Sequence, residues 1–388
     1  MMFVLALLSC LVWLYLLTAR GGFWRAADRD SPSSNTIAAG SPLALPSVCV
    51  VIPARNEAET IGMTVGSLLK QDYPGALAVL MVDDHSSDGT ASLARTAAIA
   101  AGAAARFSTL SAPALAPGWT GKLWALQHGL GHVSASPSPP DYVLFTDADI
   151  VHAADSVRAL VTRASRDGTI LISLMARLHC ETLAERAMMP AFIFFFQMLY
   201  PFAWVASPAR RIAAAAGGCM LVHRASLESV GGFEPIRNEL IDDCALARLL
   251  KPHGRIWLGL TERVSSVRVY ASLRDIRSMV VRSAYAQLQF SPWWLGLTAA
   301  AMTITYIVPP AVTLFGSGAP RVIAALAWML MALALQPTLR FYAVGRTWGL
   351  ALPFIAAFYL VLTLESAYRH RRGVGGEWKG RVHCGVSK

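Results

Sequence analysis

An apolar strand runs directly into two carboxylates in the segment Tyr142-Val143-Leu144-Phe145-Thr146-Asp147-Ala148-Asp149. Residues two apart in an extended chain project to the same side, so Asp147 and Asp149 would repel each other unless a cation lies between them. Mg²⁺ and Mn²⁺ prefer oxygen ligands and commonly bring phosphate oxygens with them. The segment therefore predicts metal-assisted chemistry on a phosphorylated donor, although an isolated Asp-x-Asp is more often a solvated strand end.

The composition indicates a soluble domain attached to membrane segments. The chain of 388 residues is 55% hydrophobic and only 15% charged, with a mean hydropathy of +0.46, which exceeds what a soluble globule carries. Residues 1–18 are almost wholly apolar, and Arg20 and Arg25 follow them. Because a secretory signal carries its positive charges first, we expect residues 1–19 to be an uncleaved anchor with Arg20 and Arg25 in the cytoplasm. A cleaved signal peptide is the alternative.

The net charge of +10 points to a membrane surface rather than to nucleic acid. Nucleic-acid binding would favour blocks of Lys and Arg interleaved with aromatic residues, and the sequence has none. Its basic residues instead flank apolar segments, as in the tail at 369–388. The six cysteines are scattered without a Cys-x-x-Cys pair, so we expect a reducing compartment and neither disulfides nor a zinc site.

From Val48 onward, short apolar strands alternate with helical stretches, after a linker at 20–46 that is rich in Ser, Pro and Ala. We expect strands at 48–52 (ended by Pro53), 77–82 and 142–145, with helices between them. This order predicts an α/β domain of three layers with a Rossmann-like, mostly parallel sheet. Ligands of such sheets bind at the carboxyl ends of the strands.

Several apolar segments predict membrane association. The aromatic-rich segment 190–206 is expected to form an interfacial or buried helix, because a full crossing would put the following residues on the wrong side. Within a C-terminal membrane region at 291–368, apolar stretches cover about 293–316, 321–339 and 347–366. The first contains Pro309-Pro310 and should be kinked or re-entrant. Three complete spans would place the basic tail outside, so we expect one of them not to cross fully.

Polar loops follow the first two predicted strands. In the loop after the second strand, at 82–90, a carboxylate fixed at the strand end could accept the imide N–H of a uracil base; an Asp-rich capped turn is the plain alternative. The loop after the first strand, with Arg55 and Glu57, places acids near the positive N-terminus of a helix. Ordinary helix capping explains that loop as well as ligand contact does.

Four further side chains carry possible chemistry. Lys122, flanked by Gly121, precedes a helix at 123–130 and could reach a pyrophosphate, or be a surface lysine. Asp242 and Asp243 stand before an apolar helix, where a carboxylate could act as general base or simply cap the helix. Arg282 lies just before the membrane region; its planar fork suits a diphosphate, although an interfacial arginine is the more common outcome.

Taken in order, these motifs over about residues 46–290 resemble the family 2 glycosyltransferases of the GT-A fold. More narrowly, the chain is similar to the bacterial hopene-associated glycosyltransferases. The narrower resemblance rests on four stretches and a tail motif: Gly118-Trp119-Thr120-Gly121-Lys122, Leu144-Phe145-Thr146-Asp147-Ala148-Asp149-Ile150, Gly217-Gly218-Cys219-Met220-Leu221-Val222, Leu240-Ile241-Asp242-Asp243-Cys244-Ala245-Leu246-Ala247 and Trp378-Lys379-Gly380-Arg381.

The resemblance implies roles for the site residues. Asp147 and Asp149 would hold Mg²⁺ or Mn²⁺ through the donor diphosphate, and Asp243 would be the catalytic base, with Asp242 where a Glu often stands. The nucleotide-sugar contacts would come from Pro53, Arg55, Glu57, Asp84 (reading the uracil), Lys122 and Arg282. Arg282 corresponds to the Arg of the family's Gln-x-x-Arg-Trp motif, which is incomplete here because Met279 and Ser283 flank it. The missing Trp favours a single transfer to a lipid over processive synthesis.

We therefore expect an inverting glycosyltransferase in the bacterial inner membrane, with its catalytic domain at 47–290 facing the cytoplasm. Its donor would be a nucleotide-sugar, a UDP-sugar by the resemblance, and its acceptor a membrane lipid, for which the resemblance implies a hopanoid. Two other functions stay open. One is a processive polysaccharide synthase, and the other is a non-catalytic membrane scaffold with a transferase-like domain.

Overall fold

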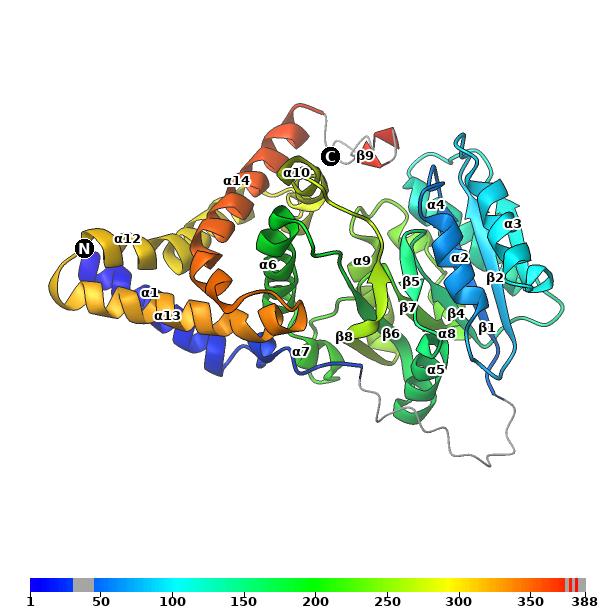
Figure 1. The fold of residues 1–388 in the computed structure, drawn as a ribbon, viewed down its shortest axis with the longest axis horizontal. Helices are drawn as coiled ribbons and strands as arrows, with labels where there is room; N and C mark the ends of the chain where they lie inside the picture. Colours follow the sequence, from blue (N-terminus) through cyan, green and yellow to red (C-terminus); the bar gives the residue numbers. More distant parts are fainter. Residues whose placement is uncertain (31–44, 374–376, 379–380, 383–388) are drawn as a thin grey trace. The chain divides into compact units, whose positions relative to one another are not determined.

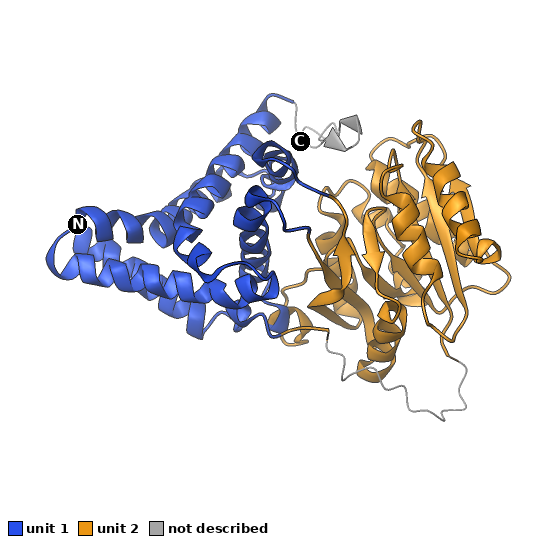
Figure 2. Ribbon diagram, viewed as in Figure 1, with its two compact units in different colours: residues 1–27, 179–203, 269–388 blue, residues 28–178, 204–268 orange. Residues whose placement is uncertain are grey.

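The computed structural model describes residues 1–30, 45–373, 377–378 and 381–382. The chain divides into two compact units, which Figure 2 colours separately. The sheet unit contains residues 28–178 and 204–268, and the helical unit contains residues 1–27, 179–203 and 269–388. Most of the predicted linker, together with Lys379 and Gly380 of the tail motif, lies outside the described residues.

An eight-stranded sheet forms the sheet unit (Figure 1). Across the sheet the order is β3-β2-β1-β4-β7-β6-β8-β5. Four of the seven pairings between these described strands are parallel and three are antiparallel. The strands are β1 (Val48–Ala54), β2 (Leu77–Asp83), β3 (Phe107–Ser111), β4 (Tyr142–Phe145), β5 (Ile150–His152), β6 (Thr169–Arg177), β7 (Met220–His223) and β8 (Arg255–Ser266).

The sheet is mixed, which corrects the expectation of a mostly parallel sheet. The alternation of strands and helices that predicted parallel pairing ends at β4. The next strand beside it, β7, arrives only after β5, β6 and a long helical segment, and it pairs antiparallel with both β4 and β6. The direction of a strand can be predicted from a sequence when a short hairpin or a βαβ crossover leads to it. In the described residues between β4 and β7, neither kind of connection joins these two strands.

Helices cover both faces of the parallel half of the sheet. Alternate residues of β1, such as Val50 and Ile52, share a buried cluster with the apolar positions of α2 (Ile61–Leu69) and α3 (Thr90–Ala100). On the opposite face, a Cβ at Gly129 of α4 (Gly121–Ser134) would lie 2.6 Å from the Val51 side chain. This confirms the three-layer arrangement, and the close approach of α4 sets the position of its N-terminal turn.

Pro53 lies inside β1 rather than ending it, because the strand continues to Ala54 in register with β2. In this parallel ladder the odd-numbered residues of β1 face β4, as the bond from the Thr146 N–H to the Val51 carbonyl shows. The pairing with β4 ends at Val51–Phe145, so the missing N–H of Pro53 costs no ladder bond.

Four further helices complete the sheet unit or border it. They are α5 (Ser156–Asp167), α7 (Phe202–Ala206), α8 (Arg224–Ser229) and α9 (Asp242–Leu250). The first turn of α9 carries Asp242 and Asp243. The predicted site therefore draws on α4, α9 and the ends of the central strands.

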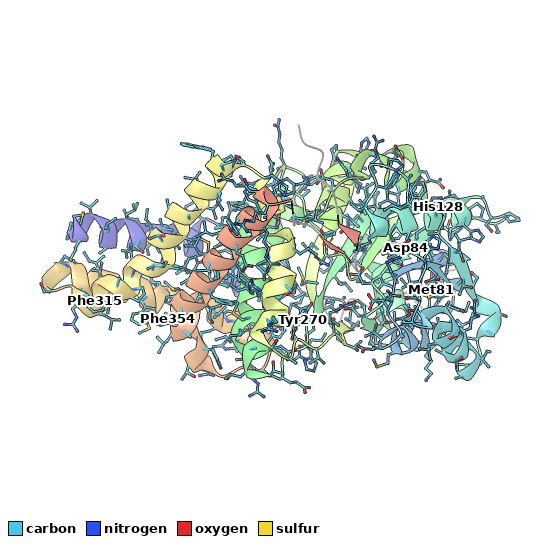
Figure 3. All side chains as sticks on the ribbon, turned by 90° about the horizontal axis from the view of Figure 1, so that it is seen from above. Met81, Asp84, His128, Tyr270, Phe315 and Phe354 are labelled. Atoms are coloured by element: carbon cyan, nitrogen blue, oxygen red, sulfur yellow. The ribbon has the colours of Figure 1, made fainter. Side chains whose placement is uncertain are left out.

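The helical unit contains three helical segments that are long and apolar enough to cross a membrane: Pro292–Phe315, Gly318–Phe341 and Arg346–Arg371. They correspond to the three apolar stretches predicted from the sequence. Large apolar side chains on them are exposed, among them Phe315 and Phe354, which Figure 3 labels. Helix α1 (Met2–Thr18), at 17 residues, is shorter than these candidates; at about 1.5 Å per residue it spans less than a bilayer core.

The first apolar segment is interrupted by a π-helical turn at Thr303–Ile307, directly before Pro309-Pro310. In the i→i+5 pattern of such a turn, the carbonyls of Ile304 and Thr305 would accept from residues 309 and 310, which are prolines and have no N–H. Side chains of α1 replace those donors. Ser9 Oγ donates to the Ile304 carbonyl at 2.7 Å, and Trp13 Nε1 donates to the Thr305 carbonyl at 2.9 Å.

The Phe-rich segment forms α6 (Leu183–Leu199), and much of it is buried within the helical unit. Phe195 meets Tyr306 and Tyr359 edge-on, with ring centroids 5.6 and 5.2 Å away. Edge-to-face pairs of this kind add to the energy of apolar burial. The expectation of an interfacial or buried helix at 190–206 stays a prediction, because packing within the helical unit does not decide between the two.

Candidate active site

Lys122 connects two carboxylates that lie on different elements. Its side chain leaves the first turn of α4, whose N-cap Thr120 accepts from the Leu123 N–H. The Nζ atom lies 3.0 Å from Asp147 Oδ1 and 3.1 Å from Asp242 Oδ2. The lysine is therefore a member of the carboxylate cluster in this structure and not an isolated surface residue.

Asp243 is oriented by backbone donors. The N–H of Gly217 donates to its Oδ2 at 2.8 Å, and the N–H of Cys244 donates to its Oδ1 at 2.7 Å. A Cβ at Gly217 would lie 3.0 Å from Lys122 Nζ and 3.5 Å from Asp243 Oδ2. A side chain at this position would displace the Lys122 ammonium, so a glycine here leaves room for it beside Asp243. The Gly-Gly segment before β7 therefore holds the carboxylate from one side.

The charges of this cluster perturb one another. Burial and the neighbouring Asp242 raise the pKa of Asp243 to about 6, although Lys122 and the two backbone donors oppose the rise. Burial alone would lower the pKa of Lys122, but the carboxylates around it raise that pKa above its usual value. Burial likewise raises the pKa of Asp147. Asp243 thus remains mostly ionised at neutral pH while being more basic than an ordinary aspartate.

Thr146 fixes the end of β4 just before the Asp-x-Asp pair. Its hydroxyl donates to the Gly218 carbonyl at 2.7 Å, so the His152 Nε2, 3.0 Å away, must donate to the same hydroxyl oxygen. Burial lowers the pKa of His152 to about 4, which keeps the ring neutral. These bonds tie β4 and β5 to the Gly217-Gly218 segment that holds Asp243.

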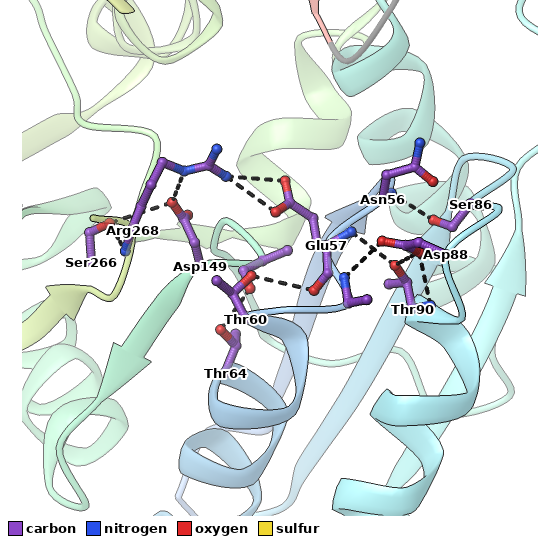
Figure 4. A network of polar contacts seen from close by, with 12 residues as sticks. Asn56, Glu57, Thr60, Thr64, Ser86, Asp88, Thr90, Asp149, Ser266 and Arg268 are labelled. Atoms are coloured by element: carbon purple, nitrogen blue, oxygen red, sulfur yellow. Dashed lines mark hydrogen bonds and ion pairs between the residues drawn. The ribbon is translucent and has the colours of Figure 1, made fainter. Parts of the chain in front are cut away.

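Asp149, the second carboxylate of the Asp-x-Asp pair, forms an ion pair with Arg268, as Figure 4 shows. The guanidinium Nε lies 2.7 Å from Asp149 Oδ2, and one terminal nitrogen lies 3.2 Å from both carboxylate oxygens of Glu57. Ser266 also donates to Asp149, at 3.4 Å. Sequence reasoning did not find Arg268, because it is separated by 119 residues from one partner and 211 from the other.

The loops after β1 and β2 interlock, as the right-hand side of Figure 4 shows. Asn56 adopts a positive φ of 51°, which lets its side chain and backbone both face the second loop. Several hydrogen bonds join the loops. Among them, Ser86 Oγ accepts from Asn56 N, Asn56 Oδ1 from Ser87 N, Asp88 Oδ2 from Ala58 N, and Thr90 Oγ1 from Glu57 N. The two loops therefore form one rigid surface at the carboxyl ends of the strands.

Arg55 and Asp84 lie together on this edge of the sheet. The Asp84 side chain is completely buried, and an Arg55 Nη atom lies 3.7 Å from its Oδ2 and 2.5 Å from its backbone carbonyl. Figure 3 labels Asp84 within the sheet unit. Pro53 is also buried. Contact between Asp84 and a base, as predicted, would require Arg55 to move.

Arg282 is the one predicted site residue outside the sheet unit. It lies in the last turn of α10 (Leu273–Ser283) in the helical unit, where it is exposed. The structure thus gathers Asp147, Asp242, Asp243 and Lys122 into one cluster. It places Asp149 and Glu57 together around Arg268, and Arg55 with Asp84.

Asp147 and Asp149 fit a divalent ion of a particular kind. They offer only carboxylate oxygens, each is partnered by a cation, and the charge of Asp149 raises the pKa of Asp147. Within the described part of the chain, no three or more His, Cys, Asp or Glu side chains are arranged to hold a metal. Mg²⁺ is commonly held by one or two carboxylates plus substrate phosphates. The pair therefore fits an ion that arrives with a diphosphate, and does not form a closed resident site.

Comparisons with known proteins agree with this architecture. Residues 49–231 match the family model described as glycosyl transferase family 2. The chain therefore contains a family 2 glycosyltransferase domain, built on a GT-A-like mixed sheet. Among curated proteins, none matches the chain significantly.

Three solved glycosyltransferase-type structures are similar to this chain at low identity, and the first of them shares its fold. A mannosyltransferase from Pyrobaculum calidifontis, in complex with GDP-Man and Mn²⁺, is 22% identical, with a TM-score of 0.53 over 91% of this chain and 99% of its own. TarS from S. aureus, in complex with UDP-GlcNAc, is 14% identical (TM-score 0.39, 84% and 92% covered). Glucosyl-3-phosphoglycerate synthase from Mycobacterium tuberculosis is 20% identical (TM-score 0.38, 60% and 76% covered).

Proposed function

We propose that this protein is an inverting glycosyltransferase that transfers a sugar from a nucleotide-sugar to a membrane lipid. The observation that carries the proposal is the placement of Asp243 beside Lys122 and Asp147 in one cluster, with both carboxylate oxygens of Asp243 oriented by backbone N–H groups. A base on one element and phosphate-binding groups on another are what a displacement at a sugar carbon needs.

Asp243 would act as the general base. Its raised pKa, about 6, makes it a better proton acceptor than an ordinary aspartate while leaving it ionised at neutral pH. As it takes the proton of the acceptor hydroxyl, the hydroxyl oxygen bonds to the sugar C1 and the bond from C1 to the diphosphate oxygen breaks. The nucleoside diphosphate leaves with that electron pair, and a single displacement of this kind inverts the anomeric carbon.

Asp147 and Asp149 would hold the divalent ion, Mg²⁺ or Mn²⁺, together with the donor diphosphate. When bound, such an ion supplies charge neutralisation for the leaving group. Lys122 would also neutralise charge on the leaving group, because its ammonium lies 3.0 Å from Asp147 Oδ1 and can bind a phosphate oxygen there. Asp242 contributes by holding Lys122 in place.

A UDP-sugar is the donor that we favour, with a GDP-sugar as the alternative. The support for UDP is Asp84, a carboxylate at the strand end that can accept an imide N–H once Arg55 swings away. The Pyrobaculum mannosyltransferase was solved with GDP-Man, whereas TarS was solved with UDP-GlcNAc. Binding measurements with UDP and GDP therefore decide which nucleotide the donor carries.

The lipid acceptor is supported by the helical unit. Three helices long and apolar enough to span a bilayer share one chain with the transferase domain, and an acceptor in the bilayer would meet such an enzyme by two-dimensional diffusion. We propose the bacterial inner membrane, with the sheet unit on the cytoplasmic side, and a hopanoid as the first acceptor to test. Arg282, at the end of α10, is proposed as a further diphosphate contact.

The test uses purified full-length protein in detergent with MnCl₂, a bacterial lipid extract, and radiolabelled UDP-glucose, UDP-GlcNAc or GDP-mannose in turn. We expect label in one discrete lipid-soluble product, and its loss in Asp243→Asn. Label in a long polymer would instead support a processive polysaccharide synthase. No turnover together with no Mn²⁺-dependent binding of UDP or GDP would overturn the enzyme function and favour a scaffold. Lipid extraction from a deletion strain, searched for one missing glycolipid, identifies the natural acceptor.

A further inference from the structure

Arg268 stands directly after β8 and bridges two carboxylates from separate loops. Asp149 follows β4, and Glu57 follows β1; the guanidinium contacts one through Nε and the other through a terminal nitrogen. The backbone beside it is fixed as well, because the Val267 N–H donates to the Asp149 carbonyl at 2.9 Å. Figure 4 shows the arginine lying between the two acids.

The ion pairs of Arg268 differ from those of Arg263, which lies on β8 itself. Arg263 is only 11% exposed and pairs with Asp30 and Asp155, as a structural arginine does. Arg268 is 37% exposed, whereas its partners Glu57 and Asp149 are much more covered. The guanidinium is thus the accessible member of its cluster, and an incoming anion can reach it without unfolding the strand end.

The net charge of the surrounding side chains also favours a change of partners when a diphosphate binds. Glu57, Asp147, Asp149, Asp242 and Asp243 carry five negative charges, against two positive charges from Lys122 and Arg268, which leaves a formal −3. A diphosphate approaching this cluster meets net repulsion. Binding of the diphosphate becomes favourable when a divalent cation binds the aspartates and the Lys122 and Arg268 side chains contact the phosphates.

We propose, on the basis of the glycosyltransferase function above, that Arg268 is a ligand of the donor diphosphate. Its guanidinium pairs with Asp149, one of the two aspartates that would hold the divalent ion. With an ion and the diphosphate bound, Arg268 would release Asp149 and turn its planar fork to phosphate oxygens, for which its geometry is suited. Lys122 would make the matching exchange at Asp147, so each aspartate is paired with one side-chain cation.

The proposal gives two effects of opposite sign when the positive charge is removed. Without Arg268, Asp149 and Glu57 lose a competitor for the ion, so Mn²⁺ alone should bind more tightly. The diphosphate loses a charge-assisted fork, so nucleotide should bind more weakly. An arginine that merely holds the strand end together would lower both affinities or neither, because its loss would loosen the carboxylates as well.

The experiment measures Mn²⁺ binding without nucleotide, by electron paramagnetic resonance, and then UDP and GDP binding at saturating Mn²⁺, by calorimetry. The variants are Arg268→Gln and Arg268→Lys in the full-length protein. The matched control is Arg158→Gln. Arg158 lies on α5, pairs with Asp72 and is 36% exposed, close to the exposure of Arg268. Thermal melting of each variant shows that it is folded.

For Arg268→Gln we expect Mn²⁺ affinity to rise several-fold and nucleotide affinity to fall about tenfold or more. Arg268→Lys should lie between the wild type and Arg268→Gln, since a lysine keeps the charge without the fork. Arg158→Gln should match the wild type. If Arg268→Gln binds both ligands as the wild type does, or loses both, the role of Arg268 is overturned while the proposed function stands. If the wild type itself binds neither UDP nor GDP with Mn²⁺, the proposed function fails and this role with it.

Discussion

The backbone N–H of Gly217 donates to the carboxylate of Asp243 at 2.8 Å, across 26 residues of sequence. The glycine precedes β7 and the aspartate lies in the first turn of α9, so the bond joins the middle of the sheet to the helix that would carry the base. It leaves the carboxylate oriented before any substrate binds.

Asp243→Asn should abolish turnover and spare donor binding. An amide keeps the size of the side chain but cannot take a proton from a hydroxyl, so we expect kcat to fall by about 10²- to 10⁴-fold. Single-turnover transfer and calorimetry with UDP and GDP measure the two properties separately. Glu239→Gln is the control, because it removes an exposed carboxylate shortly before α9. Normal turnover by Asp243→Asn would mean that another group is the base.

Gly217→Ala should reduce activity much more than stability. The added methyl group would press on the flexible end of Lys122, 3.0 Å away, and would lie in ordinary contact with Asp243. The fold can relax, but the two functional groups shift. Gly131→Ala in α4 has open space around its Cβ and should be neutral or stabilising, by up to about 1 kcal/mol. Melting curves and initial rates test both, and equal losses in the two variants would contradict the expectation.

The pH–rate profile should show a limb on the acid side. Asp243 has a pKa raised to about 6, and a base works only when deprotonated, so kcat/KM should be full above this pH and fall as the pH drops through it. At one unit below the pKa, about a tenth of the activity should remain. Rates from pH 5 to 8 at saturating Mn²⁺ measure it. A flat profile across that range would exclude a base with this pKa.

Thr146→Val should destabilise the sheet unit. The valine has the same shape, but the partly buried Gly218 carbonyl loses its donor and the neutral His152 ring loses its acceptor, at a cost of about 2–3 kcal/mol. Thr96→Val on α3 is the comparison, since that exposed hydroxyl bonds only to its own helix. We expect a change below about 0.5 kcal/mol there. Chemical denaturation of both variants gives the values, and similar stabilities would show that the Thr146 contacts contribute little.

The parts of the fold that the sequence predicts correctly are local ones. β4 begins at Tyr142 and ends at Phe145, as its apolar run indicates, and the apolar period of α2 places Ile61, Val65 and Leu68 in the core. The direction of β7 could not be predicted, because the neighbours of a strand are chosen by packing between distant segments.

The candidate site shows the same division. Asp147, Asp149 and Asp243 stand in recognisable local motifs, so their chemistry could be proposed from residue types. Arg268 stands in none, and its importance comes from contacts made across more than a hundred residues. Lys122 could be either a surface lysine or a phosphate ligand in the sequence, and only the fold shows that it meets carboxylates from two other elements.

The hydroxyl of Ser9 and the indole of Trp13 give α1 a role that its composition does not suggest. A stretch so apolar looks replaceable by any hydrophobic peptide of equal length. Yet a chimera carrying a plain Leu-Ala helix would leave the Ile304 and Thr305 carbonyls without donors in a nonpolar setting, at several kcal/mol each. Helix α1 and the proline pair at 309–310 therefore form one structural unit, and exchanging either alone should destabilise the helical unit.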